Sequence, residues 1–292
     1  MKIGHILSLL ILVTPTTAFA ETLRFDLSEK ILSQGDVLII RRVDKSTDSF
    51  RVLFSSRQYE SFIFGKKQTV FLGMHYQIRP GTYSVLTEYS VTDSTASSRF
   101  VIKIRELYPK LKYAPPKRTE ADQKKINEQQ EHKVDTISKM ALLVSSRTYF
   151  SQPVTPIKVN ASFGEKRCRD KYLWKKFNCR YHLGTDYRAA FDENHSRPVA
   201  VHSINSGVVA MTASNEIDGN VIVVDHGNGL SSEYLHLSKI MVKIGDSISR
   251  GQKIGIAGKT GSTDAIHLHL TIKMDYGKTL IDPQKFLNKV IP

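Results

Sequence analysis

Short apolar runs, each bounded by glycine or another turn residue, recur through the second half of the chain. The clearest are residues 207–213, 220–226, 230–237, 241–246, 251–258 and 267–274. Runs of this length are typical of β-strands and too short for most helices, and the glycines between them favour tight turns. The sequence therefore predicts an all-β domain with antiparallel strands over residues 146–292.

Five side chains that can bind a metal or transfer a proton lie within this region. They occur in the segments YHLGTDYRA, EYLHLS and AIHLHLT and are His182, Asp186, His236, His267 and His269. Residues two apart on a strand project from one face, so His267 and His269 are expected to point together. Two imidazoles and one carboxylate suffice as protein ligands for a catalytic zinc ion. The spacing therefore predicts one zinc site.

The remaining histidines have no patterned neighbours. We interpret them as ordinary polar residues, except that His226 is expected in a turn after a strand; the others are His5, His75, His132, His195 and His202.

Residues 22–105 also form short alternating runs, at about the spacing of a β-sandwich. The sequence predicts an N-terminal immunoglobulin-like β-sandwich over residues 21–107. This region has no cluster of charged residues or histidines, so we expect it to carry no catalytic group. Residues 146–292 are expected to be active without it.

A Pro- and Lys-rich stretch follows the predicted sandwich. The segment YPKLKYAPPKR has the composition of an extended linker, and a polar, weakly periodic pattern starts at Thr119. Residues 108–145 are therefore predicted to form a linker and a linker helix.

The first 20 residues resemble a signal peptide. Lys2 precedes a short apolar core, and AFA at 18–20 fits the cleavage pattern, so we expect cleavage after Ala20. The apolar core is too short to cross a bilayer, and no later segment reaches transmembrane length. These features predict a periplasmic or secreted protein that is associated with the cell wall.

The chain is strongly basic, with a formal net charge of +14. Such a charge suits an anionic partner such as cell wall, although ordinary surface charge is an equal alternative. No nucleic-acid motif is present. The segment GIAGKTGS resembles a phosphate-binding loop, but Lys253 stands where that motif requires glycine, so nucleotide binding is not expected. The oligomeric state is not predicted.

Two cysteines, Cys168 and Cys179, lie close together in the sequence. Export would expose them to oxidising conditions, which favours a short-loop disulfide. A Cys/His metal site is the alternative, but the cysteines lack the C-x2-C spacing.

Residues 153–287 resemble the lysostaphin-type, LytM-like zinc metallopeptidases. The resemblance rests on five motifs in order: HLGTDYRA, NVIVVDHGNGL, YLHL, VKIGDSISRGQKIG, and the Thr-Gly pair that precedes HLHL. One departure is TDAI at 263–266, where the family usually has Ser-Thr-Gly-Pro. The N-terminal region is also similar to the immunoglobulin-like domain of exported members.

The resemblance implies a role for each of the five residues. His182, Asp186 and His269 would be ligands of one Zn2+ ion per chain. His236 and His267 would lie beside the metal as catalytic groups, with their individual roles left open. The fold implied for the C-terminal domain is the antiparallel, duplicated hybrid motif of lysostaphin-type peptidases.

These features together predict an exported zinc metalloendopeptidase that hydrolyses peptide bonds in peptidoglycan, in cross-links or in stem peptides. Two alternatives stay open: a non-catalytic wall-binding regulator that activates an amidase, and a zinc peptidase that acts on proteins.

Overall fold

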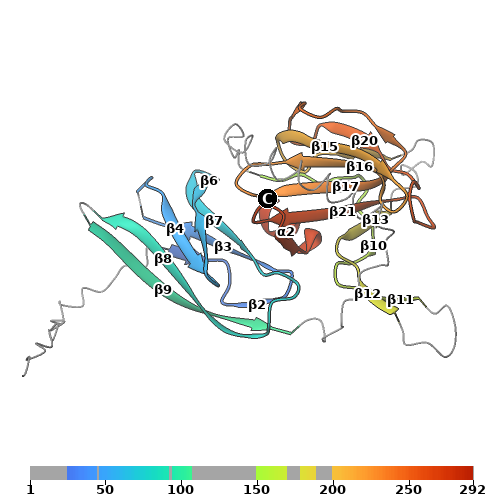
Figure 1. Ribbon diagram of the computed structural model, residues 1–292. Coiled ribbons are helices and arrows are strands. Elements are labelled where there is room, and N and C mark those ends of the chain that lie inside the picture. The colour runs from blue at the N-terminus through green and yellow to red at the C-terminus, as the bar shows by residue number, and fades with distance from the viewer. Residues whose placement is uncertain are drawn as a thin grey trace, which may run out of the picture.

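A computed structural model of the chain describes residues 25–44, 46–91, 94–106, 149–169, 178–188 and 199–291. Nearly all regular structure in these residues is β, which confirms the predicted fold class (Figure 1). The predicted signal peptide and linker helix lie outside the described residues, so the boundaries at 20, 107 and 145 stay predictions. Within the described part of the chain, no helix is both long and apolar enough to span a membrane.

The N-terminal region is a sandwich of two sheets. One has the order β1-β3-β7-β6 and the other β2-β9-β8-β4-β5, with β2 parallel to β9 and all other pairs antiparallel. The strands are β1 (Phe25–Leu27), β2 (Ile31–Ser33), β3 (Val37–Arg42), β4 (Phe50–Phe54), β5 (Arg57–Glu60), β6 (Phe62–Phe64), β7 (Lys67–Gly73), β8 (Gly81–Val91) and β9 (Ser94–Arg105).

Strand β3 contributes to two cores because its side chains alternate between two faces. Leu38 and Ile40 pack inside the sandwich. Val37 and Ile39 point the other way and belong to the core of the C-terminal region. All four side chains are therefore buried, which explains why β3 has a continuous apolar run.

The C-terminal region is organised around an eight-stranded antiparallel sheet of order β10-β13-β21-β17-β16-β15-β19, with β22 paired to β21. Its strands are β10 (Val159–Ala161), β13 (Thr185–Arg188), β15 (Gly207–Asn215), β16 (Gly219–Asp225), β17 (Ser231–Leu237), β19 (Ser247–Ile248), β21 (His267–Met274) and β22 (Thr279–Ile281). Strands β13, β21 and β17 are neighbours in the middle of this sheet, and they carry most of the candidate site residues.

Two smaller units complete the region. A three-stranded sheet has the order β14-β20-β18, and β11 pairs with β12 as a separate hairpin. Their bounds are β11 (Lys166–Arg169), β12 (Asn178–Tyr181), β14 (Ala200–His202), β18 (Lys239–Ile240) and β20 (Lys253–Ile256).

The predicted strand at 241–246 is wrong. These residues form a turn in which Asp246 Oδ2 accepts a hydrogen bond from Lys243 N at 2.9 Å. Gly245 has a φ of +90°, which a strand residue does not adopt.

Helix α2 (Pro283–Val290) was not expected from the sequence and lies where the two β regions meet (Figure 1). Asp282 caps it, accepting hydrogen bonds from the backbone N–H groups of the first turn, and proline occupies the first turn, where its missing N–H has no helical partner. The ring of Phe286 meets that of Phe71 at 5.6 Å and that of Phe150 at 4.9 Å. Aromatic residues from both regions thus form one continuous core.

Polar contacts to the same helix join the two regions. Lys285 Nζ donates to Asp36 Oδ1 at 2.7 Å, and Lys289 Nζ donates to the Val37 carbonyl oxygen at 2.9 Å and also pairs with Glu29. The sandwich is therefore docked on the C-terminal region through α2.

Candidate metal centre

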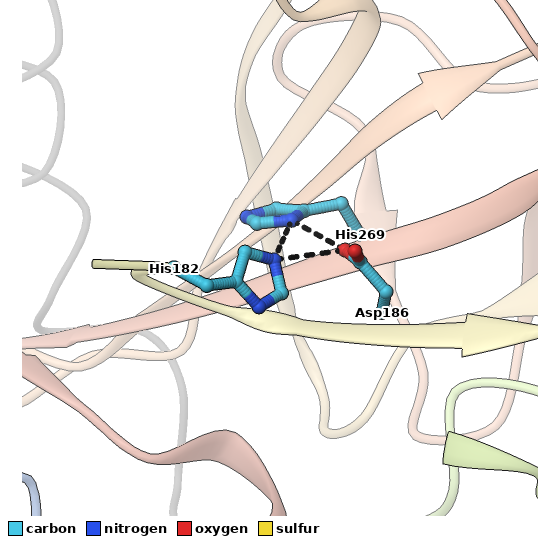
Figure 2. Close-up of side chains that lie close together, drawn as sticks. All are labelled: His182, Asp186 and His269. Carbon is cyan, nitrogen blue, oxygen red and sulfur yellow. Dashed lines mark hydrogen bonds and ion pairs between the residues drawn. The ribbon is translucent and has the colours of Figure 1, made fainter. Parts of the chain in front are cut away.

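The pairing of β13 with β21 brings two of the predicted ligands together. Asp186 and His269 are direct partners across these antiparallel strands. His182 precedes β13 and turns back toward them. Figure 2 shows the three side chains converging from β13, from the segment that precedes it and from β21.

The three side chains approach each other through single atoms. His182 Nε2 lies 3.0 Å from Asp186 Oδ1 and 3.0 Å from His269 Nδ1, and His269 Nδ1 lies 2.8 Å from Asp186 Oδ1 (Figure 2). Among the described residues, these three side chains form the group of His, Cys, Asp or Glu residues that could hold a metal ion.

The outer nitrogens of both rings are already bonded. His182 Nδ1 lies 2.9 Å from the Ser162 carbonyl oxygen, which only accepts, so Nδ1 carries a proton and Nε2 presents a lone pair in the neutral ring. His269 Nε2 lies 3.1 Å from Thr271 Oγ1. Lone pairs of a neutral histidine and a carboxylate facing each other at 3.0 Å repel unless a cation lies between them.

The donor set fits zinc. Zinc binds histidine nitrogen and carboxylate oxygen at about 2.0–2.2 Å, and three such protein ligands are usual in catalytic sites. Metal-binding histidines commonly donate their second ring N–H to a backbone carbonyl, as His182 does to Ser162.

Burial favours a neutral imidazole and hydrogen bonding favours an ionised carboxyl at this centre. His182 and Asp186 are buried. Burial lowers the pKa of His269, which keeps its ring neutral. Burial opposes ionisation of Asp186, but Arg167 Nη2 donates a hydrogen bond to its Oδ2 atom at 2.7 Å, which favours the ionised carboxylate. Neutral imidazoles and an ionised carboxylate are the forms that bind metal.

Gly184 leaves room for the His269 ring. A Cβ at this position would lie 2.4 Å from His269 Nε2 and 2.6 Å from the Leu270 carbonyl oxygen. Any larger residue would push the ring or the chain away, so the glycine in HLGTD has a steric role at the centre.

The other two predicted histidines lie beside the three candidate ligands. The His236 ring centroid is 4.9 Å from that of His267 and 6.0 Å from that of His269. Nδ1 of His236 lies 2.9 Å from the Thr260 carbonyl oxygen, and Nδ1 of His267 lies 2.9 Å from that of Ala265. In the neutral rings, both Nε2 atoms therefore carry a lone pair. His267 Nε2 is 3.5 Å from Asp186 Oδ1.

A bulge in β17 directs His236 toward the site. The register of β16 with β17 shifts between Asn220 and Ile222, and His236 has a φ of +62°. A non-glycine residue in this region is uncommon and strained, and bulges are frequent where a strand must redirect a side chain. Burial lowers the pKa of His236, so its ring is neutral at pH 7.

His226 has a structural place. It follows β16, as expected, but it is buried, with Nδ1 2.9 Å from the Ser206 carbonyl oxygen and Nε2 2.7 Å from Ser232 Oγ. His75 and His202 are outside the group of five. His5, His132 and His195 lie outside the described residues.

Sequence reasoning missed the groups that hold the five residues in place. They include the side chains of Arg167 and Thr271, which contact Asp186 and His269. Backbone carbonyls supply most of the other contacts and have no sequence signal. Arg167 could not be singled out because its contact depends on how the β11–β12 hairpin folds beside β13.

The backbone register of the β11–β12 hairpin pairs the positions of the two cysteines. Cys168 and Cys179 are direct partners in its antiparallel register. Such partners have Cα atoms about 4.5–5.5 Å apart, within the range that a disulfide can bridge. The disulfide stays a prediction, which alkylation and peptide mass mapping would test.

Three converging side chains that could hold a metal ion, with two more imidazoles beside them on an all-β scaffold, are typical of the metallohydrolase class. Comparison with known families narrows this class: the profile of Peptidase family M23 matches residues 180–283, and this part of the chain is an M23 domain. The match includes all five candidate residues.

Curated relatives align with about a third of the chain. Peptidoglycan DD-endopeptidase ShyA of Vibrio cholerae is 43% identical over 90 residues, which cover 30% of this chain and 19% of that protein. Lysostaphin of Staphylococcus simulans is 38% identical over 108 residues, 36% of this chain and 22% of lysostaphin. The alignments thus span only about a fifth of these relatives.

A solved structure resembles the larger part of the chain. A crystal structure of a candidate peptidase M23 from Pseudomonas aeruginosa aligns with 89% of this chain and 96% of its own, with a TM-score of 0.54 and 17% identity. At this identity the likeness concerns the fold, and it extends well beyond the residues that the family profile matches.

Proposed function

We propose that the protein is a zinc metalloendopeptidase that hydrolyses peptide bonds in bacterial peptidoglycan, in cross-links or in stem peptides. The observation that carries the proposal is the convergence of His182 Nε2, Asp186 Oδ1 and His269 Nδ1 within 2.8–3.0 Å of one another. In this proposal these three atoms are the protein ligands of one zinc ion.

A bound zinc ion would supply Lewis-acid polarisation of the scissile carbonyl and would lower the pKa of its water toward about 7. The residues of the chain provide the rest. Second ring nitrogens of His182 and His269 bond to Ser162 and Thr271, which fixes the orientation of both ligand rings. Asp186 is buried, and its Oδ1 atom points toward the two histidine nitrogens.

His236 and His267 are proposed to move the proton. Their Nδ1 atoms are occupied by backbone carbonyls, so each ring can accept a proton only at Nε2. A ring protonated there can then donate to the oxyanion or to the leaving amine. Both rings are fixed before substrate binds, because their carbonyl partners belong to the backbone.

The substrate class rests on the relatives and on charge. ShyA is a peptidoglycan DD-endopeptidase by name and is 43% identical to this chain over 90 residues. A net charge of +14 favours adsorption to an anionic wall. The same substrate requires export, for which we propose cleavage after Ala20 and action in the periplasm or outside the cell.

Muropeptide analysis tests this function. Purified residues 21–292 are loaded with zinc and incubated with purified peptidoglycan, with soluble cross-linked muropeptides and, in parallel, with casein. Mass spectrometry then identifies the products. His269→Ala, prepared in the same way, serves as the inactive control.

The proposal expects peptide-bond cleavage in the peptidoglycan samples and none with the control variant. Cleavage of casein alone would assign the site to protein substrates. Stimulation of an added wall amidase, with no cleavage of any substrate by the protein itself, would replace the enzyme with a regulator.

A further inference from the structure

Arg167 lies against the one carboxylate of the candidate metal centre, from outside the group of five residues. Its Nη2 atom donates to Asp186 Oδ2 at 2.7 Å. We propose that Arg167 is a positioning residue that fixes the Asp186 carboxylate as a metal ligand. This inference rests on the proposed zinc site.

The two oxygens of Asp186 have separate partners. Oδ1 lies 2.8 Å from His269 Nδ1 and 3.0 Å from His182 Nε2, so it is the oxygen that points into the centre. Oδ2 points out of it, toward the guanidinium of Arg167. The side chain of Asp186 is only 7% exposed, so water can replace this partner poorly.

The guanidinium restrains rotation of the Asp186 carboxylate from the Oδ2 side. The terminal torsion of an aspartate is broad, so the carboxylate of an unanchored Asp186 could turn Oδ1 away from the centre. A charge-assisted hydrogen bond to Oδ2 removes this freedom. Arg167 therefore sets which oxygen is presented to the metal.

The backbone around Arg167 is tied to a second ligand. Gly164 N donates to the His182 carbonyl oxygen at 2.7 Å, and His182 N donates to the Glu165 carbonyl oxygen at 2.9 Å. These bonds extend the β11–β12 ladder up to His182. The Ser162 carbonyl, a few residues earlier, orients the His182 ring. Residues 162–167 thus support two of the three ligands from one side.

An ordinary surface ion pair is the alternative. The Arg167 side chain is 46% exposed, and its Nε atom is 3.8 Å from Glu165 Oε1. A pair of that kind would add little stability and would leave metal affinity unchanged. Metal affinity therefore separates the two interpretations.

The test compares full-length mature protein with three variants: Arg167→Gln, Arg167→Lys and Lys166→Gln. Lys166 is the matched control, because it removes one positive charge from the neighbouring position, where the side chain is exposed and points to the opposite face of the strand. Zinc affinity is measured by competition with a chromogenic chelator. The visible spectrum of the Co2+-loaded protein and the melting temperature of the metal-free protein are recorded for each variant.

We expect Arg167→Gln to bind zinc about 10–100-fold more weakly and to shift the Co2+ spectrum, as loss of an outer partner of a ligand usually does. Arg167→Lys should fall between Arg167→Gln and the wild type, since a lysine keeps the charge but loses the planar fork. Lys166→Gln should match the wild type in all three measurements.

Zinc affinity of Arg167→Gln within about twofold of the wild type would overturn the inference and leave the zinc site standing. If Arg167→Gln lowers the zinc affinity and also causes a large drop in the melting temperature of the metal-free protein, Arg167 would be assigned to folding. That result would also overturn the inference. A wild-type protein that binds no zinc would overturn the inference together with the proposed function.

Discussion

Buried polar side chains serve different purposes in the N-terminal sandwich and in the C-terminal sheet. In the sandwich, Asp36 accepts from Ser33 N and from Lys285, and Arg42 donates to Asp44 and to a backbone carbonyl. These bonds satisfy strand ends, turns and the contact with α2. Each polar atom in these bonds has its own partner. The side chains named here therefore do not direct several lone pairs at one point.

In the C-terminal sheet, the corresponding atoms point toward one another. The candidate ligand atoms of His182, Asp186 and His269 meet within 2.8–3.0 Å, while the Ser162 carbonyl and the Thr271 hydroxyl contact the outer nitrogens of the two rings. Both regions have apolar cores between paired strands. An all-β scaffold can thus hold a candidate catalytic site where adjacent strands direct their polar side chains at one position.

The contact between the two regions buries an apolar face of the sandwich. The outer face of β3 and β7 is apolar and is covered by α2 and its neighbours. The sandwich therefore contributes stability to the C-terminal region through its contacts with β22, α2, Phe150 and Phe163. An isolated fragment of residues 146–292 would expose Phe150 and Phe286, and its independent activity stays a prediction.

The largest expected effect tests this shared core. Phe71 is 9% exposed and its ring meets those of Phe62, Phe64 and Phe286 at 5.0–5.6 Å. Phe71→Ala should lower the free energy of unfolding by about 3–5 kcal/mol, since it leaves a cavity between the two regions. Urea denaturation measures the change. Val101→Ala, at a position 58% exposed, is the control and should change stability by less than about 0.5 kcal/mol.

A loss below about 1 kcal/mol in Phe71→Ala would mean that the two regions are stable independently. Their cores would then not form the continuous unit described here, and the comparison would reduce to two separate domains joined by a linker.

The next effect separates the ligands from the histidines beside them. His236→Ala and His267→Ala should each keep stoichiometric zinc and lose about 10²–10³-fold in turnover, because each removes a fixed proton-transfer or oxyanion-stabilising group. Elemental analysis and muropeptide cleavage rates measure the two properties. Near-normal cleavage by either variant, or loss of zinc from either, would show that the roles are misassigned.

The smallest effect concerns Asp225, a buried carboxyl at the end of β16 in the C-terminal sheet. Asp225 Oδ1 accepts from Gly227 N at 2.8 Å, while Oδ2 has no partner among the described residues. Burial raises the pKa of Asp225 to about 6. The folded protein then binds this proton more tightly than the unfolded chain, so the contribution of Asp225 to stability falls as the pH rises from about 4 to about 6.

The effect of Asp225→Asn on the free energy of unfolding should therefore depend on pH. The substitution should be more favourable at pH 7 than at pH 4.5 by about 1–3 kcal/mol. Burial lowers the pKa of the neighbouring His226 to about 4, so its contribution to stability falls on acidification. This loss occurs in both proteins and cancels in the comparison. Urea titrations of both proteins at the two pH values supply the four free energies. Equal mutational effects at both values would mean that Asp225 is ionised in the fold at pH 4.5.

The sequence predicted the parts of this molecule that follow a regular period. His267 and His269 are two apart on a strand and do point together, and the alternating runs of residues 25–105 do form strands. The glycine in HLGTD was recognised as part of a motif, but its packing against the His269 ring required the structure.

Features that depend on tertiary contacts were not predicted. Nothing local in the sequences of β3 and β7 identified α2 as the partner that covers their outer face. The short α2 carried its own signal in the Asp-Pro pair at 282–283, which was overlooked. Arg167 reaches Asp186 only because the β11–β12 hairpin folds back beside β13.

Zinc content tests the central claim most directly. Mature wild-type protein, Asp186→Ala and His269→Ala are purified in the same way, equilibrated with zinc, dialysed against a weak chelator and examined by elemental analysis, with circular dichroism as the check on folding. The account predicts about one zinc per wild-type chain and little in either folded variant, because two remaining ligands hold the ion too weakly. Stoichiometric zinc in both folded variants would contradict it.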